Sequence, residues 1–185
     1  MQHLLKTAIP FAAALILSAC GNNSNPEKKT EIAASHEHAA TEQTQTATNG
    51  NPVLKNDKLN AVYQHYIHLT TALTKGDVAE AKIAANAMEA GAKDVAGAQG
   101  IAAAATKITA ASNIETQRAA YSGMSKDIAA LIKKEGLSGG ELYVAFCPMA
   151  FNDKGASWIS TSKEIRNPYF GEKMLGCGEV QETIK

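Results

Sequence analysis

The sequence predicts a mainly α-helical domain, an up-and-down bundle of about four helical segments with a C-terminal irregular or hairpin cap. Three observations favour this fold class. Apolar residues recur every three to four positions, glycines and capping residues separate the segments, and the chain beyond Gly140 changes to a β-prone pattern. Short connections between successive helices favour antiparallel neighbours, which is why we expect a bundle.

The first helix is indicated by six apolar positions at helical spacing and ends at Gly76. These positions are Leu59, Val62, Tyr63, Tyr66, Leu69 and Leu73. Asp77 then caps a second helix, with Glu80 completing a capping box, and this helix runs to about Asp94.

The third helical segment is rich in alanine and extends from Ile101 to Ala111. Its small side chains, like those of the second segment, allow close helix approach, but alanine buries little area and the core is therefore thin. Ser112 and Glu115 are expected to cap the fourth helix, which ends at Gly136. Its predicted buried face consists of Ile114, Tyr121, Ile128, Leu131 and Ile132.

The C-terminal segment contains two β-prone runs, 142–146 and Trp158-Ile159, which predict a small hairpin. Most aromatic side chains, and the only tryptophan, occur in this segment and in the first helix. We therefore expect the tail to fold back over the bundle and cap its core.

The N-terminus reads as a lipoprotein signal peptide over residues 1–20. Lys6 provides the positive charge, and the apolar stretch after it is shorter than the roughly 20 residues of a membrane-spanning helix. Leu-Ser-Ala-Cys resembles the bacterial lipobox, so Cys20 is the predicted lipidation site. The chain is thus expected in the bacterial cell envelope, bound to a membrane by its lipid and facing the periplasm or the exterior.

Residues 21–52 are polar and poor in large apolar side chains, which predicts a disordered tether before a domain over 53–185. The formal net charge of the chain is +0 at pH 7, and its lysines are spread among acidic residues along the chain. No basic stripe indicates a nucleic-acid partner.

Four sulfur-containing residues of the tail form two short motifs, Cys147-x-Met149 and Met174-x-x-Cys177. Thiolates and thioethers select Cu(I), and Ag(I) should follow the same preference. His65, at the edge of the buried face of the first helix, is a possible additional ligand, whereas His68 is expected to face solvent.

The same two cysteines allow a second interpretation. An exported protein with two remaining cysteines can join Cys147 to Cys177 in a structural disulfide, with both methionines filling the core. The chain is then a disulfide-stapled helical module that docks on an envelope partner and has no metal role. A thiol oxidoreductase is a third class, disfavoured because Cys-x-x-Cys is missing, and we do not expect an enzyme.

Several motifs resemble those of an uncharacterised bacterial family, domain of unknown function 3347, over about residues 54–184. They are Tyr-Ile-His-Leu-Thr-Thr-Ala-Leu from Tyr66, Cys-Pro-Met-Ala from Cys147, Gly-Ala-Ser-Trp-Ile-Ser from Gly155, and Asn-Pro-Tyr-Phe-Gly-Glu-Lys-Met-Leu-Gly-Cys-Gly from Asn167. Members of this family occur as small lipoproteins and attached to adaptor subunits of heavy-metal efflux systems. The resemblance therefore implies copper or silver handling, with an efflux adaptor or another envelope protein as partner.

Overall fold

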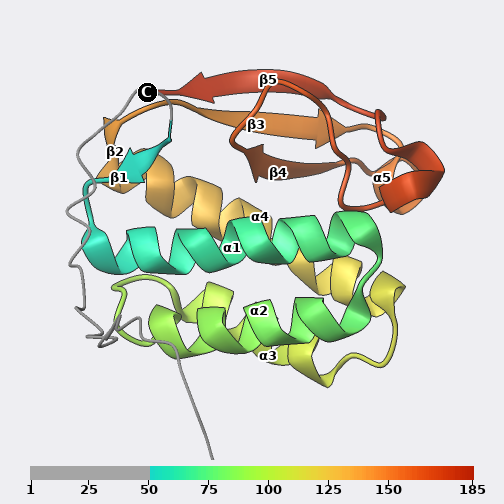
Figure 1. The fold of residues 1–185 in the computed structure, drawn as a ribbon, viewed down its shortest axis with the longest axis horizontal. Helices are drawn as coiled ribbons and strands as arrows, with labels where there is room; N and C mark the ends of the chain where they lie inside the picture. The colour runs from blue at the N-terminus through green and yellow to red at the C-terminus, as the bar shows by residue number, and fades with distance from the viewer. Residues whose placement is uncertain (1–50) are drawn as a thin grey trace, which may run out of the picture. The chain divides into compact units, whose positions relative to one another are not determined.

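The computed structural model describes residues 51–185, and the mainly α-helical bundle predicted from the sequence is confirmed (Figure 1). Four helices form the bundle: α1 (Asp57–Lys75), α2 (Val78–Ala92), α3 (Gln99–Ala110) and α4 (Ile114–Glu135). The predicted signal peptide with Cys20, and the predicted tether up to residue 50, lie outside the described residues. None of the helices in 51–185 combines the length and the apolar character needed to cross a membrane.

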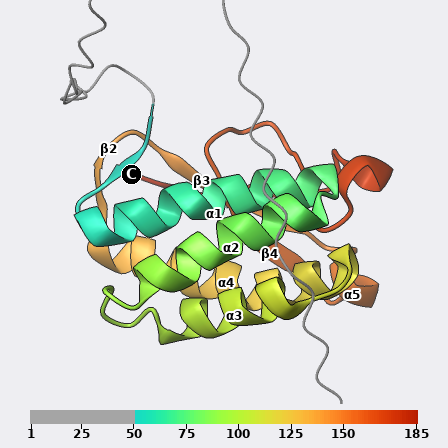
Figure 2. The ribbon, with the colours of Figure 1, turned by 60° about the horizontal axis from the view of Figure 1, so that its bottom comes forward.

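The bundle has two helix layers, and the C-terminal segment adds a third. Helices α1 and α4 lie beneath a sheet, while α2 and α3 lie on the far side of the bundle from it (Figures 1 and 2). The sheet has the strand order β4-β3-β5, all antiparallel, from β3 (Leu142–Cys147), β4 (Ala156–Ser160) and β5 (Glu179–Ile184). The tail therefore covers the bundle, as the clustering of aromatic residues predicted.

The cap is more regular than the predicted hairpin. The pairing of β3 with β4 was expected, but β5 adds a third strand, and β1 (Val53–Leu54) pairs with β2 (Leu137–Gly139). The sequence of β5 is Glu-Val-Gln-Glu-Thr-Ile, and most of it is exposed at the sheet edge. This strand has too few apolar residues to show the alternating pattern by which a strand is recognised in a sequence.

The helix boundaries follow local capping chemistry. The side chain of Asp77 accepts a hydrogen bond from the Glu80 N–H, as predicted. The predicted cap of α4 at Ser112 is wrong: the side chain of Asn113, one residue later, accepts from the Thr116 N–H. Asparagine and serine are about equally good N-caps, so two adjacent candidates left the choice open.

Small alanine side chains let helices α2 and α3 pack closely, as the composition predicted. Buried residues of α2 are Ala81, Ala84, Ala85, Met88 and Ala92, and those of α3 include Ala104 and Ala105. A Cβ atom at Gly91 would come within 3.0 Å of the Val62 side chain, which shows how near the backbones of α1 and α2 lie. Larger buried side chains are concentrated where the sheet covers the bundle, among them Trp158, Tyr66 and Tyr121.

Candidate functional site

Cys147 and Cys177 meet at one end of the sheet. Cys147 is the last residue of β3 and is 0% exposed, whereas Cys177 is half-buried in the turn before β5. Their Sγ atoms are 2.8 Å apart, and both thiols are free. The register of the sheet explains the meeting: Phe146 pairs with Glu179, so Cys147 at the end of β3 lies near the residues that precede β5.

The turn that carries Cys177 is held by one buried amide, that of Asn167. Its Nδ2 donates to the main-chain oxygen of Cys177 over 2.7 Å. Its Oδ1 accepts from the N–H groups of Tyr169, at 2.8 Å, and Phe170, at 3.2 Å. A single side chain thus satisfies three main-chain groups of the loop, which positions the second thiol without a regular strand or helix.

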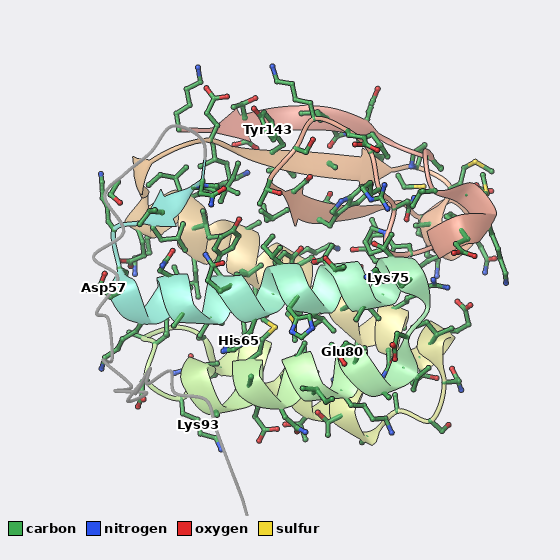
Figure 3. The ribbon with its side chains drawn as sticks, viewed as in Figure 1. Asp57, His65, Lys75, Glu80, Lys93 and Tyr143 are labelled. Atoms are coloured by element: carbon green, nitrogen blue, oxygen red, sulfur yellow. The ribbon has the colours of Figure 1, made fainter. Side chains whose placement is uncertain are left out.

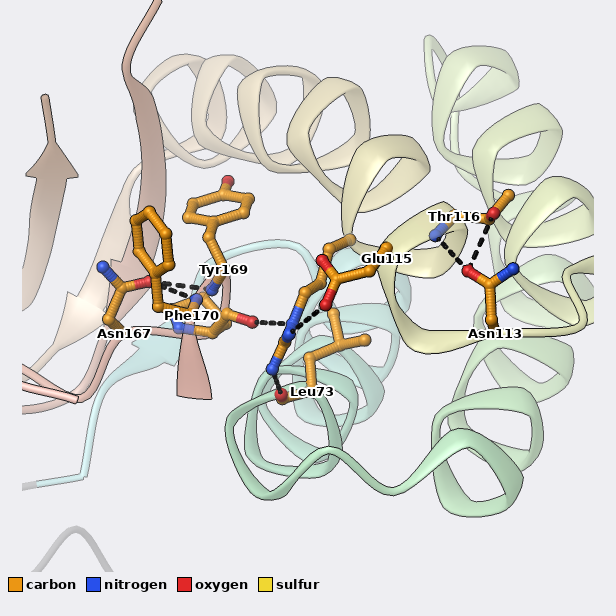
Figure 4. Close-up of polar contacts among 9 residues, drawn as sticks. Leu73, Asn113, Glu115, Thr116, Asn167, Tyr169 and Phe170 are labelled. Carbon is orange, nitrogen blue, oxygen red and sulfur yellow. Dashed lines mark hydrogen bonds and ion pairs between the residues drawn. The ribbon is translucent and has the colours of Figure 1, made fainter. Parts of the chain in front are cut away.

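A buried guanidinium fixes the same loop to the bundle. Arg118 Nη2 donates to the Leu73 oxygen at 3.0 Å and Nε to the Pro168 oxygen at 2.8 Å, while Nη1 pairs with Glu115 at 3.1 Å (Figure 4). The side chain of Arg118 is only 6% exposed. Three elements far apart in the sequence are therefore joined by one cation, and this anchors the loop on which Cys177 depends.

The thiol of Cys147 influences the protonation of Cys177. The pKa of Cys177 is raised to about 11. The larger cause is the hydrogen bond between its thiol and that of Cys147, and the smaller cause is burial. The main-chain N–H of Met149, which lies beside this sulfur, acts in the opposite direction. Since the thiolate is the strong metal ligand, a cation at this position must displace the proton of the Cys177 thiol.

Both predicted methionine ligands belong to the turns around the thiols. Met149 follows β3 and is 46% exposed, which is unusual for a large apolar side chain. The turn after it, α5 (Ala150–Asp153), contains three consecutive residues with positive φ, Phe151, Asn152 and Asp153. Such strained backbone is concentrated at functional sites.

Met174 ends the short helix η1 (Gly171–Met174) and is half-buried. The Cys177 N–H donates to the Met174 oxygen at 3.1 Å, so these two residues share one turn. Both short motifs seen in the sequence, Cys-x-Met and Met-x-x-Cys, are therefore brought to one end of the sheet by the fold.

The fold does not bring His65 or His68 close to the two cysteines. His65 is half-buried and lies on the side of α1 that faces α2, away from the sheet (Figure 3). His68 is exposed, as expected, and its Nε2 lies 2.7 Å from Glu80 Oε1. Within residues 51–185, no three His, Cys, Asp or Glu side chains come together as a metal-binding group. The candidate donors are therefore the two thiols and the two thioethers.

A network of buried hydroxyl groups lies beneath the sheet, and sequence reasoning missed it. Tyr66 Oη lies 2.9 Å from Ser125 Oγ and 2.8 Å from Tyr121 Oη, and it accepts from the Ile159 N–H at 3.0 Å. Burial raises the pKa of both tyrosines, so both stay neutral. In the sequence, the spacing of Tyr66 and Tyr121 indicated only a buried face, and their polar ends carry no separate signal.

A family model described as protein of unknown function (DUF3347) matches residues 62–140, and this confirms the suspected family; of the four motifs, the one from Tyr66 lies within the matched residues. The matched part extends from the second turn of α1 to the residue after β2 and covers most of the bundle. It does not include either cysteine of the pair. No curated protein and no solved structure matches the chain.

Proposed function

We propose that this chain, whose helical bundle matches a family of unknown function, binds one Cu(I) or Ag(I) ion through Cys147 and Cys177. The observation that carries the proposal is that the fold brings two cysteines 30 positions apart into contact, with neither in a disulfide. Soft sulfur donors select monovalent copper and silver over hard cations. Held at the membrane by Cys20, the domain serves metal handling or efflux in the envelope, beside an efflux adaptor or another envelope protein.

Cys147 and Cys177 can accommodate an ion between their sulfur atoms after one side chain has moved. A metal–thiolate bond measures about 2.3 Å in zinc sites, so an ion in line between two thiolates holds them up to about 4.6 Å apart. Cys147 is enclosed in the sheet, whereas Cys177 is half-buried in a turn. Rotation of the Cys177 side chain is therefore the movement that admits the ion.

The exposed thioether of Met149 is the best placed additional donor. Its main-chain N–H already lies beside the Cys177 sulfur, and its side chain is 46% exposed at the same end of the sheet. A thioether is neutral and a weaker donor than a thiolate, so it assists and does not dominate. Met174, one turn before Cys177, is the alternative assistant.

The test is a competition titration of the reduced full-length chain against a chromogenic Cu(I) chelator. We expect uptake of one equivalent, strongly weakened in Cys147→Ser and Cys177→Ser and weakened less in Met149→Leu or Met174→Leu. His65→Gln is the matched control and should leave uptake unchanged, because His65 lies on the other side of α1 (Figure 3). If the wild type takes up no more copper than the double cysteine variant, the metal proposal fails.

A second candidate function, the disulfide-stapled interaction module, is favoured by the same short distance. Closing a loop of 30 residues would stabilise the domain by about 3 to 4 kcal/mol in the chain-entropy model. The aromatic side chains of Trp158 and Tyr169 are buried, so they cannot form the docking surface of such a module. That surface would consist of exposed residues.

The two functions compete for the same sulfur atoms and can be separated by thiol counting. Lipidated protein, in which Cys20 is acylated, should show two reactive thiols after isolation under non-reducing conditions and unfolding, those of Cys147 and Cys177, if the metal-binding form predominates. Complete oxidation, together with no copper uptake after reduction, supports the stapled module instead.

A further inference from the structure

A second place on the molecule, separate from the sulfur atoms, has the character of a small ligand site. A pocket of about 140 Å³ lies between the C-terminal half of α1 and the segment that follows β4. Apolar atoms, among them those of Trp158 and Ile67, form the larger part of its wall, and six hydroxyl side chains also line it. The hydroxyl side chains are those of Thr70, Thr71, Thr74, Ser160, Thr161 and Ser162.

The hydroxyl groups on the helix side act as acceptors toward a ligand. Thr71 Oγ1 donates to the Ile67 oxygen at 3.0 Å, and Thr74 Oγ1 donates to the Thr70 oxygen at 2.8 Å. A hydroxyl has one proton, and in these residues it is already used by the backbone. Their free lone pairs can therefore accept hydrogen bonds from the hydroxyl groups of a ligand.

The charged groups of the pocket favour an anion. Lys75, in the last turn of α1, lines the pocket, and it takes part in none of the ion pairs found within residues 51–185 (Figure 3). Arg166 and Glu164 also line it, but their closest approach is 3.5 Å and both are largely exposed. Two cations against one carboxylate leave the pocket with an excess positive charge.

The volume limits the ligand to a few non-hydrogen atoms, since a cavity of about 150 Å³ holds a molecule the size of benzene. We propose that the pocket binds a small hydroxycarboxylate of three or four carbons, of the size of lactate or glycerate. The carboxylate lies toward Lys75 and Arg166, the hydroxyl groups donate to the threonines, and the carbon chain contacts Trp158. This inference is independent of the sulfur site.

Trp158 is the only tryptophan of the chain and lines the pocket, so its fluorescence reports binding directly. The full-length protein is titrated with sodium glycerate, against sodium chloride of equal ionic strength. We expect a saturable change for glycerate, with about tenfold weaker binding of propionate, which lacks hydroxyl groups, and of glycerol, which lacks charge.

Two matched pairs of variants locate the binding. Lys75→Met should weaken glycerate binding about tenfold, while Lys107→Met, a lysine in the last turn of α3, should not change it. Thr71→Val should weaken it roughly threefold, whereas Thr106→Val, whose hydroxyl makes the same bond to a preceding carbonyl, should have no effect. No saturable glycerate signal, equal binding of propionate, or unchanged affinity in Lys75→Met would overturn the proposal.

Discussion

The guanidinium of Arg118 donates from Nε to the main-chain oxygen of Pro168, 2.8 Å away and 50 positions later in the chain. The same guanidinium donates to the Leu73 oxygen at the end of α1. This buried cation of α4 thus connects α1 and α4 to the loop that leads to Cys177. Without it, the Pro168 oxygen would lose its side-chain donor, and the Leu73 oxygen would keep only the 3.2 Å hydrogen bond from the Gly76 N–H.

Replacing this cation should therefore be costly. We expect Arg118→Leu to lower the free energy of unfolding by about 3 kcal/mol, because the Pro168 oxygen loses its donor and the Leu73 oxygen loses one of two. Arg166→Leu is the control: its side chain is 58% exposed, and its change should stay within about 0.5 kcal/mol. Chemical unfolding of both variants measures the difference, and equal stabilities would show that the buried contacts of Arg118 contribute nothing.

The loop also depends on a glycine packed against Arg118. Gly171 has a φ of +58°, and a Cβ there would come within 2.6 Å of Arg118 Nη2 and 2.8 Å of the Thr74 oxygen. We expect Gly171→Ala to destabilise the protein by about 2 kcal/mol. Gly176→Ala, in the same segment but with nothing within 4 Å, should be nearly neutral in the same thermal or chemical unfolding experiment. A neutral Gly171→Ala would mean that the loop relaxes freely around the added methyl group.

The buried hydroxyl of Tyr66 joins α1 to the edge strand β4. It accepts the hydrogen bond of the Ile159 N–H, which would otherwise be buried without a partner. Tyr66→Phe should lower the free energy of unfolding by about 2 kcal/mol. Tyr143→Phe removes a hydroxyl that bonds to Glu141 at the surface, so it should change stability by less than about 0.5 kcal/mol. Hydrogen exchange at Ile159 gives an independent measurement, and unchanged protection there in Tyr66→Phe would contradict this role.

The predicted anchor is tested by Cys20→Ser. Because the lipid is attached to this cysteine in the lipobox interpretation, the variant should lose labelling by a fatty-acid analogue and leave the membrane fraction. Cys147→Ser, which removes a cysteine of the domain, is the control and should remain lipidated and membrane-bound. Labelling of Cys20→Ser at the wild-type level would exclude lipidation at this residue.

Local patterns determined most of the helical architecture. The spacing of Leu59, Val62 and Tyr66 predicted α1, and Gly76 and Gly136 end helices where they were expected to. These features depend on residues within a few positions of one another, so the sequence alone reveals them. The choice of Asn113 over Ser112 as a cap could not be made in this way, because both side chains can accept the same kind of bond.

The sequence by itself determined which sulfur-containing residues the tail carries and that they form two short motifs. It also determined the helical bundle that the tail covers. Only the tertiary structure decided that Cys147 and Cys177 lie 2.8 Å apart and that His65 is directed elsewhere. The pairing register of β3 with β5 and the buried contacts of Asn167 and Arg118 bring the two sulfur atoms together. These contacts join residues that are distant in the chain, and their partners are selected by packing of the whole domain, which no local spacing encodes.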